Sequence, residues 1–143
     1  MKIAIGCDHG GFELKEQLRR YLSANGHEVI DCGTDSVESV HYPVFAKMVA
    51  KNVLNGKAEY GIVVCTTGEG VSIAANRFKG IRCGIAYNDE VTRLMRAHNN
   101  ANIISFGARF ISLEDAIKRV NIFLTTHFEG GRHQVRVEML DED

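Results

Sequence analysis

The sequence predicts a single-domain α/β fold: a doubly wound sandwich with a parallel sheet of about five strands and helices on both faces. Short apolar runs alternate with longer segments of helical period, which is the pattern of parallel strands joined by right-handed helical crossovers. The chain has 143 residues, 45% of them hydrophobic, which suits one compact core and is too few for two ordinary domains. No repeat, low-complexity tract or linker divides it.

Five strands are expected where Ile, Val or Cys cluster over a few residues, at 2–6, 28–32, 61–65, 82–86 and 102–106. Helices are expected between them. In the first, apolar residues recur two to four positions apart and a glycine ends the stripe, which places the helix at 12–25. The same reasoning places helices at 42–55, 70–78, 89–98 and 113–126, and a last short helix after Gly130 and Gly131.

Charge and composition argue against two classes of partner. The formal net charge is −1, from 17 basic and 18 acidic residues mixed along the chain, so no positive field would hold a nucleic acid. No apolar run approaches the roughly 18 residues that a membrane span needs, so we expect no membrane partner and a cytoplasmic location. The four cysteines have no C-x-x-C spacing and are expected to be reduced thiols.

The strongest local motif is the loop after the third strand, which reads Cys65-Thr66-Thr67-Gly68-Glu69-Gly70-Val71-Ser72. In open parallel sheets, ligands bind beyond the carboxyl ends of the strands, where helices begin. Free backbone N–H groups there can cradle an anion, and the glycines let a ligand approach the backbone closely. Small residues also make ordinary tight strand-to-helix turns, so the loop alone fits either a binding role or a structural one.

Several familiar motifs fail at these loops. The third glycine of a dinucleotide fingerprint is replaced by Ile73. Residues 6–11 have the glycine spacing of a P-loop, but Phe12 and Glu13 stand where lysine and a hydroxyl residue would hold phosphate and Mg²⁺. A cysteine-dependent phosphatase would carry arginine where this chain has Val71. The sequence therefore disfavours nucleotide hydrolases and these phosphatases.

Two further loops carry groups that can move protons. Asp8 and His9 follow the first strand and could reach a common ligand, although Asp8 could equally cap the first helix. His98 follows a helix and precedes the fifth strand, where it could act as an acid or a base. The asparagines after it, at 99 and 100, could merely close the helix.

Cations that could hold a phosphate occur near the C-terminus and after the fifth strand. Arg132 and Arg136 are four apart, so on a helix they share one face, although a solvated surface helix would look the same. Arg109 is a further cation at the correct sheet end. No zinc-type spacing and no H-E-x-x-H motif occurs, so neither a metal nor another cofactor is expected. A thiol, N–H donors and these cations together suit isomerisation next to a carbonyl.

These segments resemble the type B ribose-5-phosphate isomerases, which are related to the two-subunit galactose-6-phosphate isomerases. The resemblance covers nearly the whole chain. It rests on Gly6-Cys7-Asp8-His9-Gly10-Gly11, Tyr42-Pro43, Cys65 with Thr67-Gly68-x-Gly70, Ser72-Ile73-Ala74-Ala75-Asn76, Gly80-Ile81-Arg82, His98-Asn99 with Ala101-Asn102, and Gly130-Gly131-Arg132-His133. It implies a metal-independent isomerase that interconverts ribose 5-phosphate and ribulose 5-phosphate through a cis-enediolate.

The resemblance also implies roles for individual residues. Cys65 would be the base that moves a proton between C2 and C1, with help from Thr67, and Asp8 and His98 would open the furanose ring. The backbone of the cysteine loop would hold the enediolate oxygen. The residues that would bind substrate are Thr66, Gly68 and Gly70 in that loop, His9, Arg109, Arg132 and Arg136 at the phosphate, and Tyr42 and Asn99 along the sugar.

In this family each site is shared between two subunits, which implies a homodimer or a tetramer of dimers, with the segment from about residue 130 reaching a partner. Thr66 departs from the family, which usually has glycine there. A β-branched residue disfavours positive φ and narrows the pocket, so the departure bears on substrate size rather than on reaction type. Glu69 is not expected to be the base, because family members that use glutamate carry it where this chain has Val71.

Two alternatives stay open. The same chemistry could act on a six-carbon aldose 6-phosphate, such as allose or galactose 6-phosphate, which differs from a pentose phosphate in the pocket length it needs. The chain could instead be a non-catalytic module that binds a sugar phosphate or a nucleotide, because flavodoxin-like folds also hold phosphates at strand ends.

Overall fold

The computed structural model describes residues 1–143 and contains one sheet of five parallel strands. The strands are β1 (Lys2–Cys7), β2 (Glu28–Asp31), β3 (Tyr60–Cys65), β4 (Cys83–Ile85) and β5 (Ile103–Gly107). Their order across the sheet is β2-β1-β3-β5-β4, and every neighbouring pair is parallel. The predicted fold class is confirmed. The order places β4 at the sheet edge and β3 at its centre.

Four helices connect successive strands as crossovers, and the last two follow β5. They are α1 (Phe12–Ala24), α2 (Tyr42–Leu54), α3 (Glu69–Ala75), α4 (Asp89–Ala97), α5 (Leu113–Thr125) and α6 (Arg132–Met139), with 3₁₀ turns at η1 (His9–Gly11) and η2 (Ala108–Phe110). The sequence predicted most of these bounds to within one or two residues. The third helix is the exception, because it ends at Ala75 rather than at Phe78. Asn76 ends it, with a side chain that bonds both the N–H and the carbonyl of Cys83.

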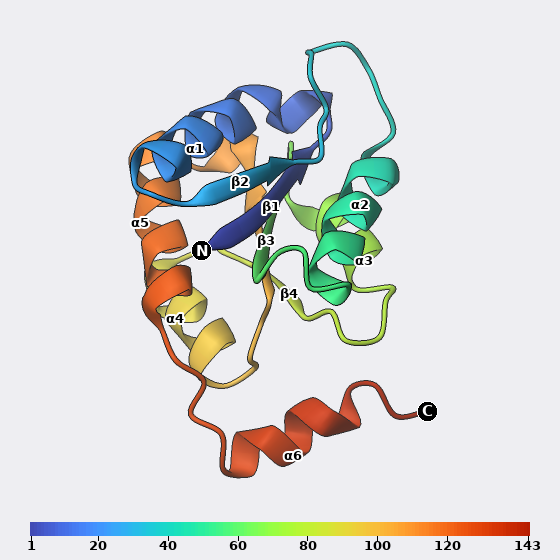
Figure 1. Cartoon of the computed structure of the whole chain (residues 1–143), viewed down its shortest axis with the longest axis vertical. Coiled ribbons are helices and arrows are strands. Elements are labelled where there is room, and N and C mark those ends of the chain that lie inside the picture. Colours follow the sequence, from blue (N-terminus) through green and yellow to red (C-terminus); the bar gives the residue numbers. More distant parts are fainter.

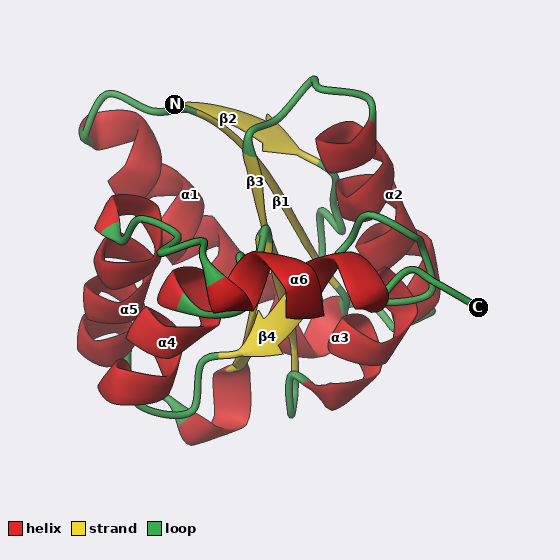
Figure 2. Ribbon diagram, turned by 90° about the horizontal axis from the view of Figure 1, so that it is seen from below, coloured by secondary structure: helices red, strands yellow, loops and turns green.

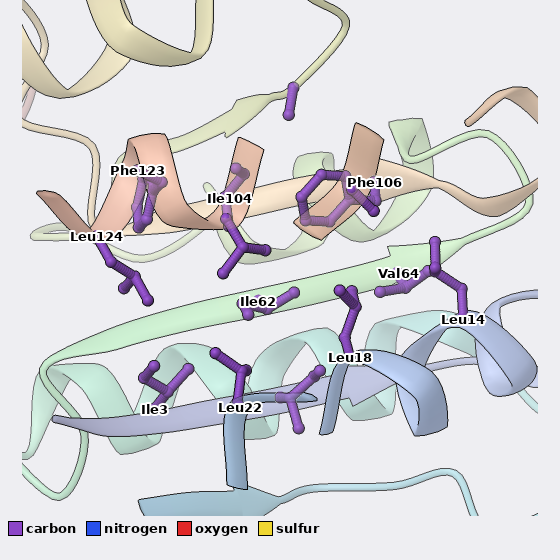
Figure 3. Packing of buried hydrophobic residues seen from close by; sticks show 14 of the residues in the cluster. Ile3, Leu14, Leu18, Leu22, Ile62, Val64, Ile104, Phe106, Phe123 and Leu124 are labelled. Atoms are coloured by element: carbon purple, nitrogen blue, oxygen red, sulfur yellow. The ribbon is translucent and has the colours of Figure 1, made fainter. Parts of the chain in front are cut away.

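The helices form two layers, with α1, α4 and α5 on one face of the sheet and α2 and α3 on the other (Figure 1). Successive side chains of β3 point to opposite faces, as the period of two in a strand requires. Ile62 and Val64 therefore pack in the first layer, where Figure 3 shows them facing α1. Val63 and Cys65 pack in the second. Cys65 is thus placed on the α2 and α3 side, at the end of the central strand.

The helix α6 lies apart from both layers, at one end of the molecule (Figure 1), and in the view from below it crosses in front of the sheet next to β4 (Figure 2). Its contact side is formed by His133 and Val137, which are buried. Val135, Met139 and Leu140 stay 59%, 58% and 63% exposed, so an apolar side of this segment is left uncovered within the single chain. No helix of the chain combines the length and the apolar character that crossing a membrane takes.

Candidate active site

Three loops meet at the carboxyl ends of β1, β3 and β5, because these strands are neighbours in the sheet. Backbone hydrogen bonds join the loops directly. The N–H of Asp8 donates to the carbonyl of Val64 at 3.2 Å, and the N–H of Arg109 donates to the carbonyl of Thr66 at 3.1 Å. Residues predicted from separate parts of the sequence are therefore fixed next to one another.

A cavity of about 450 Å³ opens between these loops, and His9, Thr66 and Arg109 are among its lining residues. The Nδ1 atom of His9 accepts a hydrogen bond from the N–H of Val40 at 3.1 Å. In the neutral imidazole the proton must then be on Nε2, which leaves that atom as a donor. A guanidinium and an imidazole N–H at one cavity are suited to an anion such as a phosphate.

The sulfur of Cys65 does not line this cavity, although the neighbouring residue Thr66 does. Cys65 is 6% exposed, and its Sγ accepts a hydrogen bond from the N–H of Gly68 at 3.1 Å. Gly68 has a φ of 81°, a left-handed conformation that glycine adopts at little cost, and its carbonyl accepts from the Ser105 hydroxyl at 2.6 Å. The loop therefore directs the N–H of Gly68 at the thiol, and the bond from Ser105 holds Gly68 in this position.

The other three cysteines differ from Cys65 in their surroundings. Desolvation raises the pKa of Cys7 to about 12, that of Cys32 to about 11 and that of Cys83 to about 12. All four cysteines are free thiols, as the sequence predicted. The sulfur of Cys65 accepts a hydrogen bond from the loop N–H of Gly68.

Asp8 has the capping role that the sequence left open. Its Oδ1 accepts from the N–H groups of Gly10 at 2.9 Å and Gly11 at 3.2 Å, which caps the turn η1 rather than α1 itself. The side chain is almost fully buried. Both bonds use the same oxygen, so Oδ2 remains for a ligand, and capping and chemistry are compatible in this residue.

Two glycines of the site are required by close packing. A Cβ on Gly70 would lie 2.8 Å from the ring of Tyr42, which places this predicted sugar-lining residue against the cysteine loop. A Cβ on Gly10 would collide with the Thr66 hydroxyl. The threonine that departs from the family pattern thus fills space between the first and third loops. Thr67 is exposed, and its hydroxyl accepts from the N–H of Glu69 at 3.2 Å.

The remaining predicted residues lie elsewhere on the chain. His98 ends α4 just before β5 begins, so it is at the amino ends of the strands, whereas Cys65 is at a carboxyl end. His98 lines a separate cavity of about 210 Å³ together with Asn99 and Arg136. Arg132 is exposed at the start of α6. A single chain therefore brings the predicted residues together as two groups rather than as one.

The second group contains two residues to which the sequence assigned no role. His133 stacks on His98 with ring centroids 4.1 Å apart and planes 12° from parallel. Oε1 of Glu129 lies 3.7 Å from Nε2 of His98 and 3.6 Å from Nε2 of His133. His133 belongs to the segment Gly130-Gly131-Arg132-His133, so the resemblance pointed to it, but only the fold brings Glu129 beside His98.

His98, Glu129 and His133 also offer ligand atoms that all lie within 4.8 Å of one another, close enough to consider a metal ion. The charges around them are mixed. Burial lowers the pKa of His133, the charges of His98, Arg132 and Arg136 lower it further, and the carboxylate of Glu129 raises it. Arg132 and Arg136 oppose a divalent cation, whereas Glu129 favours one.

Comparisons with known proteins show that the chain belongs to the ribose/galactose isomerase family. A family model described as Ribose/Galactose Isomerase matches residues 3–140. Ribose-5-phosphate isomerase B of Escherichia coli K12 is 47% identical over 139 residues, which cover 97% of this chain and 93% of that protein. A ribose 5-phosphate isomerase structure from Thermotoga maritima has a TM-score of 0.98 at 49% identity and covers 99% of this chain and 98% of its own. The Mycoplasma genitalium ribose-5-phosphate isomerase B structure holds bound ribulose-5-phosphate, with a TM-score of 0.92, 37% identity and coverage of 97% and 93%.

Proposed function

Because the chain belongs to the ribose/galactose isomerase family, we propose that it is an aldose-ketose isomerase that interconverts ribose 5-phosphate and ribulose 5-phosphate. The observation that carries the proposal is the sulfur of Cys65, held by the N–H of Gly68 in the same loop as Thr66, which lines a cavity together with His9 and Arg109. A thiol, oxyanion donors and an anion site are the parts that this reaction needs. The relatives, two of them named above as ribose-5-phosphate isomerase B, support the pentose phosphate as substrate.

In the proposed reaction, the phosphate binds at His9 and Arg109, and the sugar extends over the cysteine loop. The Cys65 thiolate takes the proton from C2 of the open aldose, the electron pair left on C2 forms the C1–C2 double bond, and the carbonyl pair moves to O1, which gives the enediolate. Backbone N–H groups of the loop stabilise the charge, a contribution of about 3 to 4 kcal/mol to the barrier. O1 then gains a proton and O2 loses one, with the help of the Thr67 hydroxyl, and return of the proton from Cys65 to C1 gives the ketose. No step requires a metal or another cofactor.

The substrate begins as a closed ring, so a second pair of groups is needed to open it. We assign this step to Asp8, whose Oδ2 is free, and to His98. Within one chain Cys65 and His98 lie at opposite ends of the sheet, so the complete site requires His98 from a second copy. The uncovered apolar side chains of α6 support an arrangement in which the segment from about residue 130, with Arg132 and Arg136, reaches a partner. The active form is then a homodimer or a tetramer of dimers.

The size of the substrate is the point at which Thr66 matters. Its hydroxyl fills the space against Gly10 at the cavity, which favours a five-carbon sugar over a six-carbon one. Equal or better turnover of allose 6-phosphate or galactose 6-phosphate would overturn this choice while leaving the reaction type intact. A non-catalytic binding module is the other reading, and it predicts no exchange of the C2 proton with solvent.

The deciding experiment measures ribose 5-phosphate turnover and C2 proton exchange in EDTA, with wild type, Cys65→Ala and Cys83→Ala side by side. We expect wild type and Cys83→Ala to be equally active with and without chelator, and Cys65→Ala to lose both readouts by at least about 10³-fold. Full activity in Cys65→Ala would remove the proposed base. Sensitivity of the wild type to EDTA would contradict a metal-independent reaction.

A further inference from the structure

We propose that Glu129 and His133 are positioning residues for His98, which together fix the plane of its imidazole and the nitrogen that it presents to the sugar. The inference rests on the proposed function, in which His98 takes part in opening the ring. It adds Glu129, which selects the tautomer of His98, and His133, which supports the His98 ring. Neither side chain is expected to touch the substrate.

Backbone contacts show why Glu129 is held at this place. Its N–H donates to the carbonyl of Ala97 at 3.0 Å, the last residue of α4, so the segment before α6 is tied to the end of the helix that carries His98. The N–H of His133 donates to the carbonyl of Gly130 at 3.1 Å, which starts α6 in the same place. The hydrogen bond between Glu129 and Ala97 therefore helps to position both Glu129 and His133 beside His98.

The carboxylate of Glu129 determines which nitrogen of His98 is free. Its Oε1 is 3.7 Å from Nε2 of His98, which is longer than a hydrogen bond but well within the range of charge attraction. An imidazole whose Nε2–H is directed to a carboxylate leaves Nδ1 as the nitrogen for chemistry. A carboxylate orients the catalytic histidine of the Ser-His-Asp triad by the same principle, with the two ring nitrogens exchanged.

The ring of His133 supplies a flat support. It is 8% exposed and lies 4.1 Å from the His98 ring, so it blocks rotation of His98 toward that side. Because burial and nearby positive charge lower the pKa of His133, it stays neutral and does not repel His98 when His98 carries a proton. His133 thus acts as a neutral support, and His98 acts as the proton donor.

Ring opening moves one proton from the sugar to Asp8 and one from His98 to the sugar. The Asp8 carboxylate of one copy takes the proton from O1, the electron pair of that O–H bond forms the C1 carbonyl, and the C1–O4 bond breaks. The pair from that bond goes to O4, which takes a proton from Nδ1 of His98 of the second copy. Glu129 faces the Nε2–H side of the imidazolium that donates this proton.

Ribulose 5-phosphate allows this step to be separated from enolisation. Its C2 carbonyl cannot form a furanose ring, because the O5 that would close it carries the phosphate, so the ketose binds in its open form. Exchange of its C1 protons with D₂O needs the base Cys65 but no ring opening. Aldose turnover needs both.

We would measure both rates by NMR for Glu129→Gln, His133→Ala and His133→Phe, with Glu138→Gln, which like His133 is on α6, as the carboxylate control. Glu129→Gln and His133→Ala are expected to lower ribose 5-phosphate turnover roughly 10- to 100-fold and to leave ketose exchange within about threefold of wild type. His133→Phe keeps a flat ring and should recover most of the turnover lost in His133→Ala. Glu138→Gln should change neither rate.

A parallel fall of both rates in Glu129→Gln and His133→Ala would show that these residues act on folding, assembly or substrate binding, and would overturn the proposal. Unchanged turnover in both would overturn it as well. Failure of the proposed function is seen separately: Cys65→Ala would keep ketose exchange, or His98→Ala would keep aldose turnover.

Discussion

The backbone N–H of Gly68 donates a hydrogen bond to the sulfur of Cys65 at 3.1 Å. Two features hold the donor in place: the left-handed conformation of Gly68 and the bond from the Ser105 hydroxyl to its carbonyl. The sulfur is 6% exposed, so it is shielded from bulk water before any ligand arrives. A base that is already fixed in position loses little conformational freedom when the substrate binds.

Cysteine modification should be selective and slow. Desolvation raises the pKa of Cys7 and Cys83 to about 12 and that of Cys32 to about 11, so these three remain thiols at pH 8. We expect iodoacetamide to label Cys65 alone, more slowly than free glutathione, and ribose 5-phosphate to protect it. Peptide mass spectrometry against time measures this. Loss of activity that follows labelling of Cys83 instead would count against Cys65 as the base.

A substitution at Gly10 should be rescued by one at Thr66. In Gly10→Ala the new methyl group collides with the Thr66 hydroxyl, which must rotate or shift at the cavity. We expect kcat/KM for ribose 5-phosphate to fall about tenfold in Gly10→Ala and to return to within about threefold of wild type in the double variant with Thr66→Gly. The four steady-state measurements form a double-mutant cycle, and strictly additive effects would exclude the predicted contact.

Mixed oligomers test whether the site is shared between copies. Cys65→Ala and His98→Ala each damage one half of every site in a pure homodimer. A heterodimer of the two has one site in which both residues are intact, so co-expression should restore about a quarter of wild-type activity, since half of the dimers have one good site of two. Differently tagged chains allow the heterodimer to be purified and assayed. Activity that stays at the level of the single variants would indicate a site within one chain.

The ion-pair network on α1 predicts a pH-dependent contribution to stability. The Arg19 guanidinium donates to Glu16 at 2.6 Å and the buried Lys15 ammonium at 2.8 Å, and these bonds lower the pKa of Glu16 from 4.5 to about 2. A lowered pKa stabilises the folded state above the unfolded value of 4.5, and this contribution is lost as pH falls through 4.5 toward about 2.

Glu16→Gln should therefore lower the free energy of unfolding at pH 7 by about 1 kcal/mol, after allowance for solvent screening of a partly exposed group. The difference from wild type should shrink steadily below pH 4.5. Urea titrations at several pH values measure it, with Glu28→Gln, an exposed acid on β2, as the control. A difference that is constant with pH would assign the effect to packing instead of charge.

Much of the fold and half of the site could be predicted from local patterns. The runs of Ile, Val and Cys marked all five strands, and glycines marked the ends of helices, because both signals act over a few residues. The cysteine loop was identified for the same reason, since its thiol and glycines are consecutive. Asp8 was open to both capping and chemistry, and the structure adds that Oδ1 caps while Oδ2 is left free.

The sequence by itself determined which residues stand at strand ends and helix starts, since chain direction and periodicity are properties of neighbouring residues. Only the tertiary structure decided the order β2-β1-β3-β5-β4 and the meeting of His98, Glu129 and His133. These relationships depend on which elements pack together across long stretches of chain. Packing between distant segments leaves no periodic trace in a single sequence, so no local pattern could have revealed them.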